Sequence, residues 1–122
     1  GLQHYGAANW SGDIVARWSD LKDQVAHGTN FSIAGIPFWT MDIGGFSVED
    51  RYNTLNPKAE DVAEWKELET RWYQFGSFCP LYRSHGEYPY RELFTISPLK
   101  PPFAKSLPQP TKYTIGYSNP LL

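Results

Sequence analysis

The sequence predicts an α/β fold in which helices alternate with buried, parallel strands. A helical pattern over residues 19–28 leads directly into a short, apolar, β-branched run over residues 31–36. A second, longer helical pattern over residues 57–75 leads in the same way into the apolar run 78–82. Helices that each feed a buried strand are typical of β/α units built on a parallel sheet.

The first helix is expected to begin near Ser19 or Asp20, because either side chain can cap a helix N-terminus. One apolar stripe follows at helical spacing, and Gly28 suits the end of the helix. The stripe consists of Leu21, Val25 and Ala26. The run over residues 31–36 then predicts a buried strand.

The second helix is expected to begin at Asn56 and Pro57, with asparagine as the cap and proline at the first helical position. Apolar side chains recur along it every three or four residues, which predicts a long amphipathic helix that ends near Gly76. They are Val62, Trp65, Leu68, Trp72 and Phe75. The opposite face is charged, and we expect it to be solvated. It carries Glu60, Asp61, Glu64, Lys66 and Glu67.

Composition excludes several classes of protein. The chain has 122 residues and a net charge of -2, so it offers no polycationic surface for nucleic acid. No apolar run approaches the ~20 residues that span a bilayer. The single cysteine, Cys79, cannot form an internal disulfide, and its apolar surroundings predict a core thiol.

Candidate catalytic residues lie in the polar loops that follow the predicted strands, where parallel α/β folds place their chemistry. Asp13 lies close to the indole of Trp10, and an apolar neighbour favours the protonated carboxyl group that a general acid needs. The alternative is an aspartate that caps a turn. Asp42 precedes two glycines and could hold a substrate hydroxyl, orient an arginine or cap a structural turn.

The third polar loop contains Arg83 and His85. A histidine here could donate to a hydroxyl, act as a base or serve a structural role. The other histidines, His4 and His27, lie far from it in the chain, so we expect neither a metal site nor a cofactor. Taken alone, these residues predict part of an α/β domain with polar loops at the strand ends.

Three segments, taken together and in this order, resemble family 31 glycoside hydrolases. The first is Tyr5-Gly6-Ala7-Ala8-Asn9-Trp10-Ser11-Gly12-Asp13. The second is Gly35-Ile36-Pro37-Phe38-Trp39-Thr40-Met41-Asp42-Ile43-Gly44-Gly45-Phe46, and the third spans residues 71–86. The resemblance covers residues 1–94 and is greatest to bacterial α-xylosidases, with α-glucosidases close behind.

The resemblance implies an incomplete (β/α)8 TIM barrel, comprising roughly the last three β/α units and an irregular C-terminal tail. Members of this family are retaining α-glycosidases that use two aspartates. The motif of the acid/base aspartate matches Asp13. The substrate-binding positions that the resemblance implies are Trp10, Asp42, Phe46, Arg83 and His85, with His85 on a sugar hydroxyl.

The family's nucleophile aspartate lies on the fourth strand, and we expect this chain to begin downstream of it. The sequence is therefore interpreted as a fragment of an enzyme that hydrolyses terminal α-xylosyl or α-glucosyl residues of oligosaccharides, inactive in isolation. The alternative is a non-catalytic remnant or a weak carbohydrate-binding fragment. Its expected partners are the oligosaccharide and the upstream half of the barrel, with neither nucleic acid nor membrane.

Residues 95–122 depart from the family pattern and form the second predicted region. Six of the ten prolines fall within residues 98–122, which show no helical or strand period. We expect a disordered tail that arises either from a shifted reading frame or from a proline-rich linker. Its apolar residues favour the shifted frame.

Overall fold

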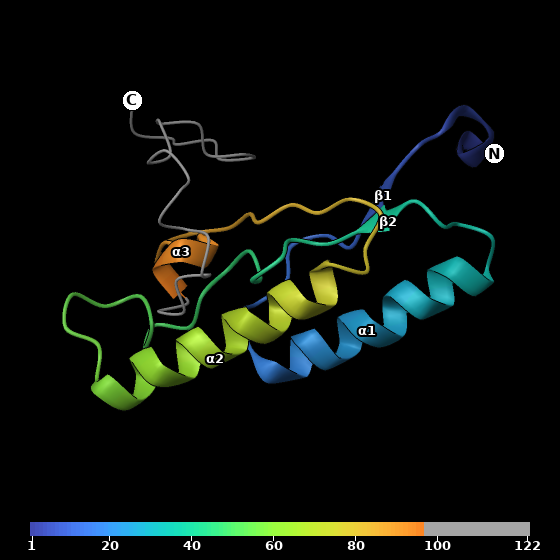
Figure 1. Cartoon of the computed structure of the whole chain (residues 1–122). Coiled ribbons are helices and arrows are strands. Elements are labelled where there is room, and N and C mark those ends of the chain that lie inside the picture. Colours follow the sequence, from blue (N-terminus) through green and yellow to red (C-terminus); the bar gives the residue numbers. More distant parts are fainter. Residues whose placement is uncertain (97–122) are drawn as a thin grey trace, which may run out of the picture.

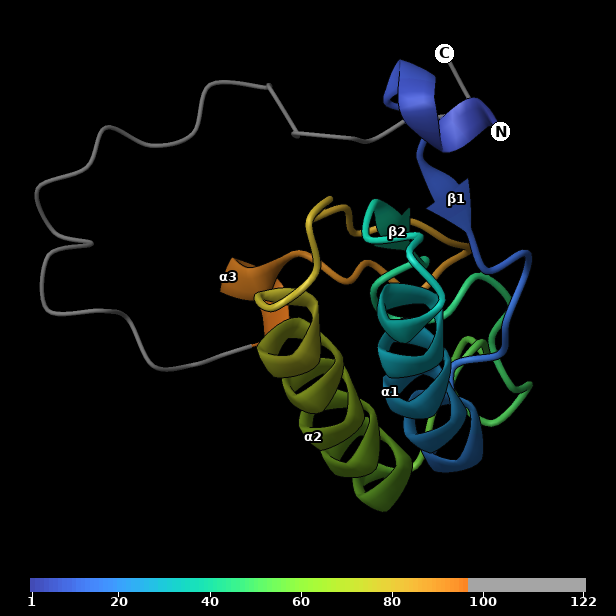
Figure 2. The same cartoon turned by 90° about the vertical axis from the view of Figure 1, so that its right-hand side faces the viewer.

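The computed structural model describes residues 1–96, so the tail predicted from residue 95 onward lies almost wholly outside the described residues. The elements are η1 (Leu2–Tyr5), β1 (Asn9–Trp10), α1 (Trp18–Ile33), β2 (Trp39–Thr40), α2 (Ala59–Gly76) and α3 (Leu93–Ile96). Helices α1 and α2 run side by side, and the extended segments lie on one side of them (Figures 1 and 2). Among these helices, none is long and apolar enough to cross a membrane.

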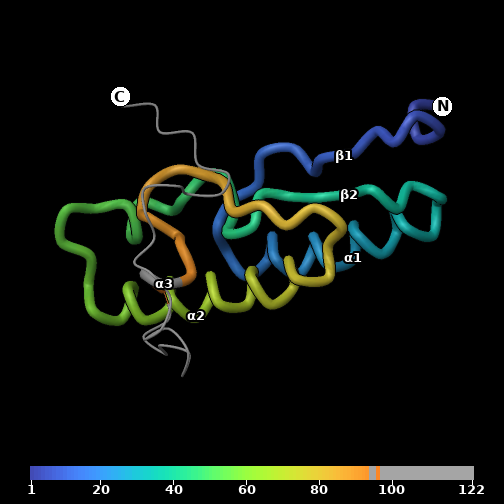
Figure 3. The backbone as a smooth tube through the Cα atoms, turned by 45° about the horizontal axis from the view of Figure 1, so that its top comes forward, coloured from blue at the N-terminus to red at the C-terminus, as the bar shows by residue number. Residues whose placement is uncertain are grey.

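The extended segments run parallel, as predicted. β1 pairs with β2, with Asn9 opposite Trp39. Beyond this pair, single parallel bridges join Val15 to Ser47 and Ile43 to Ser84. The chain that continues from β2 therefore lies between the other two segments (Figure 3). This arrangement places the polar loops that follow the three segments at one end of the structure.

Helix α1 is longer than predicted, and the strand predicted over residues 31–36 is wrong. The helix begins at Trp18 and runs to Ile33 without a side-chain cap from Ser19 or Asp20. The helix continues through Gly28, where a Cβ atom would lie 2.9 Å from the ring of Trp39. The glycine therefore allows α1 to pack closely on β2 rather than ending the helix.

Helix α2 confirms the predicted amphipathic pattern. It begins at Ala59, slightly after the predicted start, and ends at Gly76 as expected. A Cβ atom on Gly76 would lie 2.5 Å from the side chain of Ile43, so this glycine also permits close packing. The helix and the segment continuing from β2 share one hydrophobic core. Its buried members are Leu21, Trp39, Met41, Ile43, Leu68, Trp72, Tyr73 and Ile96.

The strand predicted over residues 78–82 is not formed. Phe78 is 86% exposed, so this apolar run turns outward instead of entering the sheet. Pro80 removes a backbone donor that strand pairing would require. The parallel bridge falls instead at Ser84, beyond the predicted run. Cys79 packs against the core, as predicted for a structural thiol.

Candidate functional site

Asp42 lies at the centre of the candidate site. Its side chain is fully buried. The Nε1–H group of Trp10 donates to Oδ1 of Asp42 at 3.1 Å, and Nη2 of Arg83 donates to the same oxygen at 2.7 Å. The three residues come from three parallel segments. Asp42 therefore orients an arginine, which is one of the three roles that the sequence suggests for it.

The second carboxylate oxygen of Asp42 takes no part in these hydrogen bonds. Oδ2 is buried and has no hydrogen-bond partner within residues 1–96. A buried polar atom without a partner is costly, so such atoms are normally satisfied by protein, water or ligand. The hydrogen-bonding capacity of Oδ2 is therefore left unused by residues 1–96.

Two glycines shape the backbone that follows Asp42. Gly44 and Gly45 have φ values of 101° and 76°, which L-residues with a side chain rarely adopt. The N–H group of Gly45 donates to the carbonyl of Asp42 at 2.9 Å and closes a tight turn. A Cβ atom on Gly45 would lie 2.4 Å from the backbone nitrogen of Ala16, so the turn also lies directly against the neighbouring segment.

Phe46 and His85 form a second pair of predicted site residues. Their ring centroids are 5.5 Å apart, and both side chains are half-buried. The backbone N–H group of Glu87 donates to the carbonyl of Phe46 at 2.9 Å and joins the two loops. The aromatic contact and this hydrogen bond together hold the two loops against each other.

Asp13 lies apart from these interactions. Its side chain is exposed and, within residues 1–96, forms no hydrogen bond or ion pair. The preceding Gly12 has a φ of 85°, and the parallel pairing resumes at Val15. The loop therefore presents Asp13 to solvent beyond the carboxyl end of β1. The structure brings the other five predicted residues into two contacting groups.

Two buried charged residues beneath these loops, Glu69 and Arg91, were not predicted from the sequence. Glu69 is fully buried, and burial raises its pKa to about 8 although the charge of Arg91 opposes that shift. Burial also lowers the pKa of Arg91, whose guanidinium nonetheless stays protonated near neutral pH. Glu69 lies four residues after Trp65 and three before Trp72. This spacing places Glu69 on the apolar face of the helix, and it was a signal in the sequence from which this residue could have been found.

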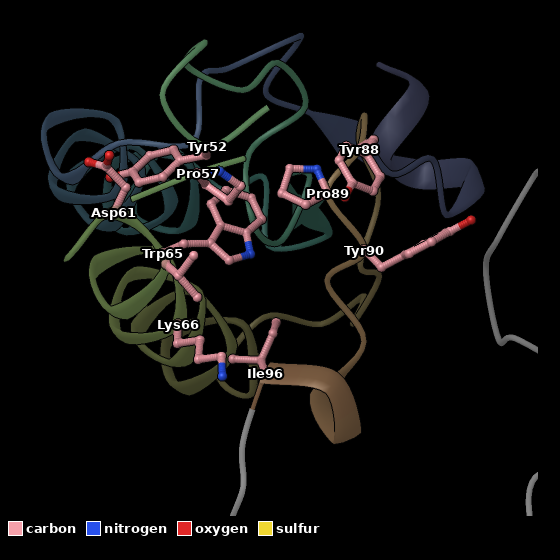
Figure 4. A pocket seen from close by; sticks show the side chains of 10 residues that line it. Tyr52, Pro57, Asp61, Trp65, Lys66, Tyr88, Pro89, Tyr90 and Ile96 are labelled. Carbon is pink, nitrogen blue, oxygen red and sulfur yellow. The ribbon is translucent and has the colours of Figure 1, made fainter. Parts of the chain in front are cut away.

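The described part of the chain offers no metal site: no group of three or more His, Cys, Asp or Glu residues there could hold an ion. A hollow of about 210 Å³ lies beside α2, and Figure 4 shows Trp65 at its wall. Tyr52, Tyr88 and Ile96 also line it. Its lining includes none of the six predicted site residues.

Comparisons with known proteins bear on the family. The glycosyl hydrolase family 31 TIM-barrel domain matches residues 1–109. An α-xylosidase from Saccharolobus solfataricus is 43% identical over 86 residues, which are 70% of this chain and 10% of that protein. Neutral α-glucosidase C from Homo sapiens is 41% identical over 85 residues, again 70% of this chain but 8% of the relative.

A solved structure agrees with these relatives. The family 31 α-xylosidase from Xanthomonas citri matches with a TM-score of 0.74 and 52% identity, over 87% of this chain and 11% of that one. The chain thus spans about a tenth of the length of the relatives that it matches. It belongs to glycosyl hydrolase family 31 and has the fold of a segment of the TIM-barrel domain of that family.

Proposed function

We propose that this segment supplies the general acid/base and part of the sugar-binding pocket of a retaining α-glycosidase. The substrates are oligosaccharides with terminal α-xylosyl or α-glucosyl residues. The observation that carries the proposal is the buried Asp42, which Trp10 and Arg83 hold through one oxygen while the other oxygen has no partner within residues 1–96. Such a carboxylate is suited to a sugar hydroxyl.

Asp13 is proposed as the acid/base. In the retaining mechanism, this carboxyl group protonates the leaving glycosidic oxygen and then deprotonates the water that hydrolyses the covalent intermediate. The exposure of Asp13 at the carboxyl end of β1 supports this role, since the group must reach both the substrate and water. The nucleophile would lie ~5 Å away and would come from another part of the barrel.

The remaining residues are proposed to bind the sugar. Asp42 and Arg83 would contact hydroxyl groups of the residue that is cleaved, and half-exposed Trp10 would pack against its ring. His85 would donate to a further hydroxyl, with Phe46 fixing the orientation of the imidazole. The polar groups of these residues, both neutral and charged, favour a polyhydroxylated ligand over an apolar one.

The segment is proposed to comprise roughly the last three β/α units of the barrel. Three parallel extended segments separated by α1 and α2 support this assignment. Its partner is then the upstream half of the barrel. We expect the isolated chain to lack hydrolytic activity, because the retaining reaction requires an acid/base and a nucleophile together.

A chimera tests the proposal. Residues 1–94 replace the matching segment of the Xanthomonas citri α-xylosidase, and hydrolysis of aryl α-xyloside and aryl α-glucoside is measured. We expect turnover in the chimera and a loss of at least ~10²-fold in kcat for Asp13→Ala. The matched control is Asp23→Ala, which removes an exposed carboxylate from α1. Full turnover in Asp13→Ala would overturn the assignment.

The second candidate function is weak sugar binding without catalysis. The half-exposed indole of Trp10 beside Asp42 favours it, because this pair needs no nucleophile to hold a sugar. Titration of the whole chain with methyl α-xyloside, followed through the Trp10 indole resonance, tests this candidate. A saturable shift supports it, and an unmoved resonance contradicts it.

A further inference from the structure

We propose that Arg91 is a positioning residue that fixes the loop carrying Asp42 and Phe46 against the loop carrying Arg83 and His85. The inference deepens the proposed function and rests on it, because those two loops form the proposed sugar site. Arg91 itself is 5% exposed and lies beneath them. It therefore acts on the site through the backbone and not by touching a ligand.

The guanidinium of Arg91 donates to three backbone carbonyls. Nη1 donates to the carbonyl of Gly45 and, at 3.4 Å, to that of His85. Nη2 donates to the carbonyl of Glu87. Gly45 belongs to the first loop, and His85 and Glu87 belong to the second. One side chain thus joins the residue before Phe46 to His85 itself.

The loops are shaped to admit this side chain. A Cβ atom on Gly44 would lie 2.9 Å from Nη1 of Arg91, and a Cβ atom on Gly86 would lie 2.6 Å from the same nitrogen. Both glycines have positive φ values, 101° and 151°. Any larger residue at either position would occupy the space that the guanidinium now fills.

Arg91 is also held in place from the helix side. The hydroxyl of Tyr73 on α2 donates to the backbone carbonyl of Arg91 and shares a hydrogen bond of 2.9 Å with the hydroxyl of Ser84. The guanidinium carbon lies 5.6 Å from the centre of the Trp65 ring. Helix α2 therefore fixes both the backbone and the side chain of the residue that joins the loops.

The geometry requires a guanidinium in particular. Arginine presents five N–H donors on a rigid plane, so it can serve carbonyls on two sides at once. The ammonium of lysine is a compact charge on a flexible stem, and it cannot span the same carbonyls. Without the fork, the two loops would retain only their backbone contacts and the distance between Phe46 and His85 would vary.

The test uses the whole 122-residue chain and NMR. In Arg91→Met, we expect the contact between the Phe46 and His85 rings to disappear from the NOE spectrum. The Glu87 amide should exchange with solvent at least tenfold faster, while amides within α1 and α2 change less than twofold. Arg71→Met is the matched control, because Arg71 is an exposed arginine of α2 that pairs with Glu67. It should leave the ring contact and the Glu87 amide unchanged.

A purely structural role for Arg91 predicts a different pattern. If Arg91 only stabilised the fold, its replacement would accelerate amide exchange throughout α1 and α2 as well as in the loops. This result in both Arg91→Met and Arg91→Lys would overturn the proposal. An unchanged ring contact in either variant, or no such contact in the unsubstituted chain, would overturn it too. Titration with methyl α-xyloside is scored separately: absence of binding by the unsubstituted chain counts against the proposed sugar site, whereas the ring contact reports on Arg91.

Discussion

Replacement of Glu69 by glutamine should make the stability of the chain less dependent on pH between pH 5 and 8. Glu69 is fully buried, and neither carboxylate oxygen has a hydrogen-bond partner within residues 1–96. Burial raises its pKa from 4.5 to about 8. The neighbouring ionisable groups are Arg91, which stays charged, and Tyr73, whose pKa is raised to about 12. Neither changes charge between pH 5 and 8.

The sign follows from proton linkage. Above pH 4.5 the unfolded chain loses the proton of Glu69 while the folded chain keeps it, so the free energy of unfolding falls as the pH rises. The contribution is complete below pH 4.5 and is lost as the pH passes through about 8. At 1.36 kcal/mol per pKa unit, the raised pKa corresponds to about 5 kcal/mol in all. Most of this, roughly 3–4 kcal/mol, falls between pH 5 and 8.

Urea unfolding followed by circular dichroism at pH 5, 6, 7 and 8 measures the effect. The unsubstituted chain should lose roughly 3–4 kcal/mol more stability over this range than Glu69→Gln. Glu67→Gln is the control, since Glu67 is an exposed carboxylate of the same helix. It should follow the unsubstituted chain. Equal pH slopes for the unsubstituted chain and Glu69→Gln would refute the reasoning.

Three further predictions concern packing and the site. Leu68→Ala should destabilise the fold by about 2–5 kcal/mol in urea unfolding, because Leu68 is fully buried between the helices and the sheet. Gly45→Ala should be more destabilising than Gly6→Ala: both glycines have positive φ, but only a Cβ atom at Gly45 meets neighbouring backbone. Asp42→Asn should move the Trp10 indole resonance and weaken binding of methyl α-xyloside at least tenfold in an NMR titration, because it removes the charge that holds Arg83.

Each of these predictions has a contradicting result. A loss below about 1 kcal/mol for Leu68→Ala would show that the space beneath the sheet is loosely packed. Equal losses for the two glycine variants would mean that the close approach to Ala16 contributes nothing. An unmoved indole resonance in Asp42→Asn would show that the hydrogen bond from Trp10 does not form in solution.

Sequence patterns predicted helix α2 well but not helix α1, which continues through Gly28 and exposes Val25 of its predicted apolar stripe. The recurrence of apolar residues gave the end and buried face of α2, because a helix of 18 residues repeats its period several times. Short apolar runs were misassigned. Residues 31–33 complete α1, and Phe78 is exposed. Both runs were predicted as strands because a run of five or six apolar residues has too few repeats to distinguish strand from helix.

The candidate site was predictable only in part. Motifs identified Asp42 and Arg83, and an arginine partner for Asp42 was among the roles considered. Arg91 left no such signal, because its partners are backbone carbonyls, which every residue carries. Glu69 could have been found, since it interrupts an apolar stripe at helical spacing. The burial of Glu69 is nevertheless hard to predict, because the residues around it in the sequence are charged.

The role of Asp13 as general acid is tested most directly by changing the leaving group. In the chimera described above, Asp13→Asn is assayed with α-xylosyl fluoride, whose leaving group needs no proton, and with an alkyl α-xyloside, whose leaving group does. Acid catalysis is typically worth ~10²–10⁴-fold. We predict a loss of kcat/KM in this range for the alkyl xyloside and of less than about tenfold for the fluoride. Equal losses on both substrates would contradict the assignment of Asp13 as the acid.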